Sequence, residues 1–129
     1  STSKKVVLLA LTPITDRTGL ADVNLVIKYE KLLQKLVNSI KKSDNIDIIG
    51  VNNRDLNNFN VDIKNSLNII DQIPSDFVKI SESGINNPDS VVELKKAGFD
   101  GFLIGEYFMK SDSPNDLANK FINLVENEI

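Results

Sequence analysis

Two short apolar segments of the chain each run into a glycine, with polar residues beside it. These segments are Val78–Ile85, which contains Gly84, and Gly101–Glu106, which contains Gly105. Since glycine has no Cβ, its backbone N–H can approach an anion closely; either glycine alone is more typical of a tight turn, whereas two such turns together favour an anion site. Glu82 precedes Gly84 between two serines, where a carboxylate can move a proton or orient a lysine. The alternatives are a surface glutamate or a salt bridge with a neighbouring helix. The pairing of the two glycine turns predicts a phosphate-binding site with acid–base chemistry beside it.

Three further side chains belong to this candidate site. Asn52 follows another apolar segment and offers a donor and an acceptor for a substrate hydroxyl, unless it is a turn residue. Arg54 can hold a substrate carboxylate with its guanidinium group, or form a structural ion pair with Asp55 or Asp62. The carboxylate of Glu106 would repel a phosphate unless it is turned away, which leaves its backbone N–H as a candidate donor.

The composition excludes several kinds of chemistry. The 129 residues contain no cysteine and no histidine, so thiolates, disulfides and imidazole bases are ruled out, and we expect no metal and no cofactor. A net charge of −3 disfavours a nucleic-acid partner, because binding to the phosphate backbone depends on clustered Lys and Arg. With 41% hydrophobic residues the chain can bury a core, and we expect a single domain over residues 1–129.

The apolar run Val6–Leu11 near the start of the sequence predicts a buried strand rather than a signal peptide. No apolar segment approaches the ~18–20 residues that a membrane span requires. We therefore expect a cytoplasmic chain without a membrane partner.

Strand and helix signals alternate along the sequence. The helix signals include Asn87-Pro88 and Ser113-Pro114 at helix starts, and Gly98 at a helix end. The predicted strands are Val6–Leu11, Ile46–Val51, Phe77–Ser81 and Phe102–Gly105. The predicted helices are Leu20–Lys42 (or a strand Val23–Ile27 with a helix from Glu30), Ile63–Ile73, Pro88–Ala97 and one from Pro114 through Val125. Tyr107, Phe108 and Met109 are expected to pack in the core under the last loop rather than to form a substrate shelf.

Four consecutive strand–helix units predict an α/β fold with a parallel sheet. A complete (β/α)₈ barrel takes about 250 residues, so the expected fold is a (βα)₄ half of a TIM barrel. Its two open sheet edges would be covered by a second half or by a second copy of the chain. An open flavodoxin-like sheet is the alternative.

Three segments resemble the last strands of indole-3-glycerol-phosphate synthase, in the same order and at similar separations. These are Ile48–Leu56, Val78–Ile85 and Gly101–Glu106, within a resemblance that covers roughly residues 46–115. The family is a (β/α)₈ lyase of tryptophan biosynthesis, which closes and decarboxylates a carboxyphenylamino-deoxyribulose phosphate. The resemblance therefore implies a phosphate-bearing small-molecule substrate.

The resemblance also implies roles for individual residues. It places Asn52, Glu82 and Ser83 at the catalytic and substrate-contacting strand ends. It places Gly84, Leu103, Gly105 and Glu106 around the substrate phosphate.

The chain departs from the family pattern at its front. In the family, proton transfer depends on lysines and a glutamate from earlier strands, and the stretch Leu25–Tyr29 has no carboxylate at the comparable position. Two hypotheses follow. The chain either works as the phosphate-binding half of such an enzyme, once an N-terminal half-barrel supplies the lysines, or is a non-catalytic half-barrel that forms a homodimer and keeps a phosphate site.

Overall fold

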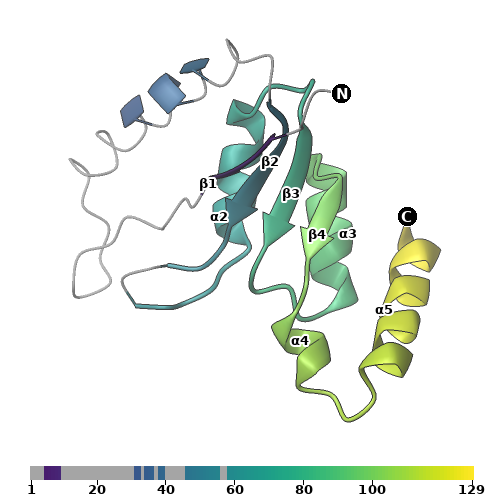
Figure 1. Ribbon diagram of the computed structural model, residues 1–129. Coiled ribbons are helices and arrows are strands. Elements are labelled where there is room, and N and C mark those ends of the chain that lie inside the picture. Colours follow the sequence, from purple (N-terminus) through teal and green to yellow (C-terminus); the bar gives the residue numbers. More distant parts are fainter. Residues whose placement is uncertain (1–4, 10–30, 33, 37, 40–45, 56–57) are drawn as a thin grey trace.

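The computed structural model describes residues 5–9, 31–32, 34–36, 38–39, 46–55 and 58–129. Its strands form one parallel sheet in the order β1-β2-β3-β4 (Figure 1). A sequential order is that of a barrel segment and differs from the flavodoxin-like order, so the α/β half-barrel prediction is confirmed and the alternative topology is not found among the described strands. The strands are β1 Lys5–Leu9, β2 Ile46–Asn52, β3 Val78–Glu82 and β4 Gly101–Leu103.

The predicted helices of the second part of the chain are present. At the start of α3 the Ser90 backbone N–H donates to Asn87 Oδ1 at 2.8 Å, and Gly98 ends this helix with φ 122°. Ser113 precedes the last helix without a side-chain capping bond, and a short helix before it was not predicted. The helices are α2 Lys64–Ile69, continued by the 3₁₀ turn η1 Ile70–Gln72, then α3 Pro88–Ala97, α4 Glu106–Met109 and α5 Pro114–Glu128.

The predicted helix Leu20–Lys42 and its alternative, a strand at Val23–Ile27, both lie largely outside the described residues. Residues 31–32, 34–36 and 38–39 are helical, which agrees with both interpretations.

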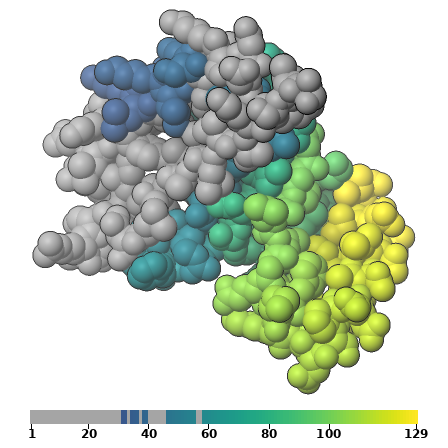
Figure 2. Space-filling view, in the orientation of Figure 1, coloured from purple at the N-terminus to yellow at the C-terminus, as the bar shows by residue number. Residues whose placement is uncertain are grey.

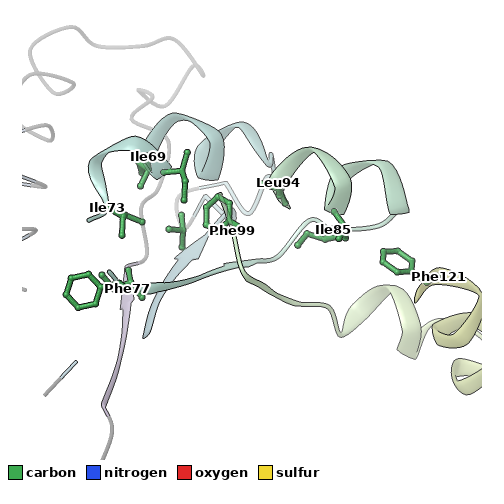
Figure 3. Packing of buried hydrophobic residues seen from close by; sticks show 11 residues of the cluster. Ile69, Ile73, Phe77, Ile85, Leu94, Phe99 and Phe121 are labelled. Carbon is green, nitrogen blue, oxygen red and sulfur yellow. The ribbon is translucent and has the colours of Figure 1, made fainter. Parts of the chain in front are cut away.

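The hydrophobic core lies on one face of the sheet, against α2 and α3 (Figures 1 and 3). Strand alternation directs Ile49 and Val51 of β2 to this face, where both are almost fully buried. Helix α5 packs on α3 and α4, and its surface borders theirs in the space-filling view (Figure 2). The remaining core residues are Ile69, Ile70, Ile73, Phe77, Ile85, Val91, Leu94, Phe99 and Phe121.

The opposite face of the sheet carries side chains in rows across the strands. The row at the carboxyl ends joins Asn52, Glu82 and Leu103, which are register partners. Apolar groups on this face reach solvent, since Val78 is 45% exposed and Leu103 is 57% exposed. In a closed barrel this face would fill the interior in layers.

A buried hydrogen-bond network around Asn53 connects β2, β3 and α2. The side chain of Asn53 is inaccessible to solvent, and its Nδ2 donates to Ser81 Oγ and to the Ser83 carbonyl, each at 3.0 Å. Its Oδ1 accepts from the Ser66 backbone N–H at 3.0 Å and from Ser66 Oγ at 2.7 Å. Because the amide uses both hydrogens and both lone pairs of its oxygen, the network is fully satisfied at this residue.

The turn after β3 has a backbone that favours glycine. Ser83 and Gly84 have φ angles of 71° and 73°, both in the left-handed region. A Cβ on Gly84 would overlap Cγ1 of Val61, which forms an isolated bridge with Arg54. Gly84 is therefore required by the fold itself.

We expect Gly84→Ala to lower the free energy of unfolding by roughly 2–4 kcal/mol, through left-handed strain and overlap with Val61. The matched control is Gly105→Ala, because Gly105 has φ −118° and no atom lies within 4 Å of a Cβ built there. Urea unfolding should place this control within about 0.5 kcal/mol of the wild type. Equal losses of stability in the two variants would contradict the conclusion that the fold requires glycine at Gly84.

Asn53→Ala should lower the free energy of unfolding by about 3 kcal/mol, because it leaves the buried hydroxyls of Ser66 and Ser81 with fewer partners. Asn119, exposed on α5, supplies the control Asn119→Ala, which should change stability by less than about 0.5 kcal/mol. A small loss at Asn53 in thermal or urea unfolding would show that the network does not hold the strands together.

Candidate active site

A cleft of about 850 Å³ opens at the carboxyl ends of β3 and β4. Ligands of parallel α/β proteins bind at this end of the strands. The cleft brings together seven of the eight site residues predicted from the sequence, and Lys110 joins them. The seven are Arg54, Glu82, Ser83, Gly84, Leu103, Gly105 and Glu106.

Asn52 is the predicted site residue that does not line this cleft. It lies beside Glu82 in the sheet register and is partly buried. Its Oδ1 accepts a hydrogen bond from the Arg54 backbone N–H at 2.9 Å, as in an Asx turn. The side-chain oxygen of Asn52 therefore acts as that of a turn residue, as the alternative interpretation predicted. Its amide hydrogens form no hydrogen bond with the described residues.

Glu82 is partly buried at the rim of the cleft. Within the described part of the chain, its carboxylate makes no hydrogen bond and no ion pair, so the alternative of a salt bridge with a neighbouring helix is not found there. The backbone carbonyl of Glu82 accepts from the Asn53 N–H at 2.9 Å, which fixes the strand end. The carboxylate thus lies at the cleft, and none of the described residues occupies its oxygens.

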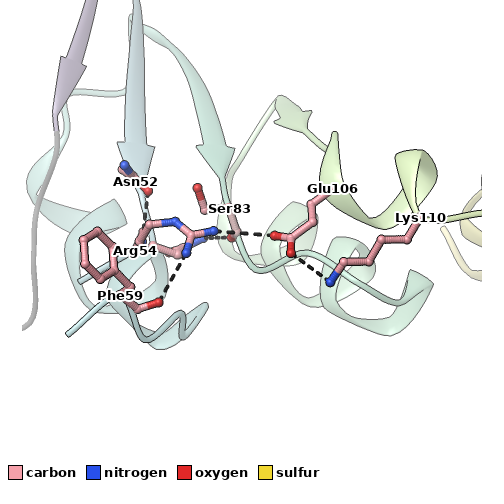
Figure 4. A network of polar contacts seen from close by, with 7 residues as sticks. Asn52, Arg54, Phe59, Ser83, Glu106 and Lys110 are labelled. Carbon is pink, nitrogen blue, oxygen red and sulfur yellow. Dashed lines mark hydrogen bonds and ion pairs between the residues drawn. The ribbon is translucent and has the colours of Figure 1, made fainter. Parts of the chain in front are cut away.

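Arg54 forms an ion pair with Glu106, not with Asp55 or Asp62 as one interpretation of the sequence predicted. Its Nη2 lies 3.6 Å from Glu106 Oε2, and its Nη1 donates to the Phe59 carbonyl at 3.3 Å (Figure 4). The predicted pairs are sequence neighbours, whereas the fold carries the guanidinium across the end of β3 to α4.

The carboxylate of Glu106 lies between two cations (Figure 4). Its Oε1 is 2.8 Å from Lys110 Nζ, one helical turn further along. The hydrogen bond and the charge of Lys110 lower the pKa of Glu106 below its usual range, with a smaller contribution from Arg54, while desolvation opposes them. The cluster of these three residues therefore carries two positive charges and one negative charge.

The two glycines of the cleft differ in what they do for the fold. Gly84 is required by its φ angle and by Val61, as described above. Gly105 has an ordinary negative φ, and a Cβ there would extend into open space. The fold thus gives no internal reason for glycine at Gly105, whereas close approach of a ligand would give one.

Sequence reasoning missed Lys110 and Asn53. The Glu-x-x-x-Lys spacing of Glu106 and Lys110 is a readable signal for an ion pair on a helix. Asn53 carried no such signal, because its partners come from two distant segments of the chain. Lys110 pairs with Glu106, and Asn53 donates to the carbonyl of Ser83, so both contact residues that line the cleft.

Tyr107 and Phe108 are partly buried and pack against the core as predicted, and Tyr107 also lines the cleft. Tyr107 and Phe108 lie 5.7 Å and 5.4 Å from the ring of Phe121. Met109 is 77% exposed, so its predicted burial is wrong. The cause is the short helix α4, which turns this side chain outward.

Among the residues that the structure describes, no group of acidic side chains is arranged to hold a metal ion. None of the helices in the described ranges is long and apolar enough to cross a membrane.

A solved structure with a similar fold is the Amycolatopsis orientalis BexX/CysO complex. The match has a TM-score of 0.54 at 13% sequence identity and covers 94% of this chain and 55% of that one. At this identity the likeness concerns the fold alone.

Curated relatives are much closer in sequence. The indole-3-glycerol phosphate synthase of Bacteroides thetaiotaomicron is 47% identical over 81 residues, which are 63% of this chain and 31% of that protein. The enzyme of the same name from Caldanaerobacter subterraneus is 53% identical over 66 residues, 51% of this chain and 26% of that protein. The chain thus matches about a third or less of the length of these relatives.

The sequence model of one family, indole-3-glycerol phosphate synthase, matches residues 19–121. This match extends further toward the front of the chain than the residues 46–115 recognised from the motifs. It includes every residue predicted to line the cleft. The chain belongs to the indole-3-glycerol phosphate synthase family.

Proposed function

We propose that this chain forms the phosphate-binding part of an indole-3-glycerol phosphate synthase barrel and contributes residues to its decarboxylative ring closure. The observation that carries the proposal is the convergence of Glu82, Ser83, Gly84 and Gly105 on one cleft at the carboxyl ends of the strands. The curated relatives bear the name of this enzyme, but the chain matches only part of their length.

In this proposal the phosphate lies beside Gly84 and Gly105. Open space at the Cα of Gly105 would allow phosphate oxygens to reach its backbone N–H, and Arg54 would add a cation at the same cleft. Leu103 and Glu106 would border this phosphate. No metal and no cofactor is required for these contacts.

Glu82 and Ser83 would act on the reacting part of the substrate. A carboxylate that has no partner among the described residues and is held at the end of a strand is suited to move a proton or to orient a lysine. Asn52, next to Glu82 in the register, would present its amide hydrogens to a substrate hydroxyl. The lysines of the reaction would come from further strands that complete the barrel.

The exposed apolar side chains on the sheet face opposite α2 and α3 support completion of the barrel. Exposed Val78 and Leu103 on this face would become interior residues beside additional strands. The same observation favours a second candidate, in which two copies of the chain cover each other's sheet as a homodimer and bind phosphate without catalysis.

Mixing this chain with a chain that carries the remaining strands of a relative's barrel should produce decarboxylation of the carboxyphenylamino-deoxyribulose phosphate. Glu82→Gln in this chain should lower the rate by about 10²-fold or more, as expected for loss of an acid–base group. The measurement is release of carbon dioxide with formation of indole-glycerol phosphate. A rate that does not depend on this chain, or on Glu82, would refute the catalytic proposal.

Gly105→Ala should weaken the binding of inorganic phosphate by about tenfold, because the added methyl group would occupy the path to the backbone N–H. Since this substitution should leave stability nearly unchanged, the loss would not reflect unfolding. Titration calorimetry of the wild type and the variant measures both affinities. Unchanged affinity would remove Gly105 from the site.

Native mass spectrometry separates the two candidates for the isolated chain. The second candidate predicts a dimer that binds phosphate and shows no activity with the complementing strands. A monomer without affinity for phosphate would eliminate it.

A further inference from the structure

The carboxylate of Glu106 forms an ion pair with a different cation of the cleft at each of its two oxygens. One of its oxygens faces Arg54, at 3.6 Å, and the other faces Lys110, at 2.8 Å. Figure 4 shows the guanidinium, the carboxylate and the ammonium group in a row, with Ser83 close by. All four residues line the same cleft.

This arrangement joins elements that are otherwise separate. Arg54 follows β2, whereas Glu106 and Lys110 belong to α4, which follows β4. Because β3 lies between those strands in the sheet, the pair of Arg54 and Glu106 passes across the carboxyl end of β3, where Gly84 lies. The carboxylate therefore neutralises cations at the place where an anionic ligand would need them.

The exposure of these side chains indicates that the contacts are weak. The side chains of Arg54, Glu106 and Lys110 are 35%, 64% and 75% exposed, and ion pairs this accessible contribute little to stability. A phosphate dianion carries more charge than one carboxylate and can accept from both cations. It is therefore able to displace Glu106 from them.

We propose that Glu106 is a built-in competitor of the substrate phosphate, which holds Arg54 and Lys110 in the empty cleft and is displaced when the phosphate binds. This inference rests on the proposed function, because it needs a phosphate site in the cleft. It assigns Glu106 a part in setting affinity, separate from the backbone contact that the sequence suggested. Glu82, the other acid of the cleft, has no cation of its own among the described residues and does not share this role.

The test is a titration of the full chain with inorganic phosphate, by calorimetry at constant pH and ionic strength. Glu106→Gln should bind phosphate about 3- to 10-fold more tightly than the wild type, since it releases two cations and removes one negative charge. The matched control is Glu93→Gln, which removes an exposed carboxylate from α3, outside the cleft, and should leave the affinity unchanged. Adding Arg54→Gln to Glu106→Gln should abolish most of the gain.

The outcomes separate this inference from the function on which it rests. If the wild type binds phosphate and Glu106→Gln binds it equally or less tightly, the competitor role is wrong while the phosphate site stands. If neither protein binds phosphate, both proposals fail. An equal gain in Glu93→Gln would assign the effect to net charge and also overturn the competitor role, whereas a gain in Glu106→Gln alone supports it.

Discussion

The structure depends on the hydrogen bonds that Asn53 makes inside the molecule. A buried amide is costly unless all of its donors and acceptors are used, and here they connect the ends of two strands to the first turn of α2. One of these bonds ends on the carbonyl of Ser83, which starts the left-handed turn. A network that serves stability therefore also sets the direction in which Ser83 and Gly84 leave β3, directly after Glu82.

The residues at and beneath the cleft are of two kinds: some are needed for folding, and others are not. Asn53, Gly84 and the apolar side chains beneath the sheet have complete internal explanations in packing and hydrogen bonding. Gly105 and the carboxylate of Glu82 have none within the described residues, although both lie at the cleft. Residues without a structural role among the described contacts are the ones expected to bind a ligand.

Much of this arrangement could be predicted from the sequence, because it depends on local signals. Apolar runs ending at glycine and the Asn87-Pro88 start of α3 specify strands and a helix by short-range chemistry. The partner of Arg54 and the burial of Asn53 could not be predicted, since they depend on which distant segments the sheet brings together. Met109 was placed wrongly because its orientation follows from a helix too short to show periodicity.

The central claim is that a phosphate binds between the turns at Gly84 and Gly105. It is tested most directly by titrating the ¹⁵N-labelled chain with inorganic phosphate and following each backbone amide by NMR. We predict that the largest shifts fall on the amides of Gly84, Gly105 and Glu106 and saturate with one dissociation constant. Shifts confined to exposed lysines elsewhere, such as Lys95 and Lys96 on α3, would contradict it.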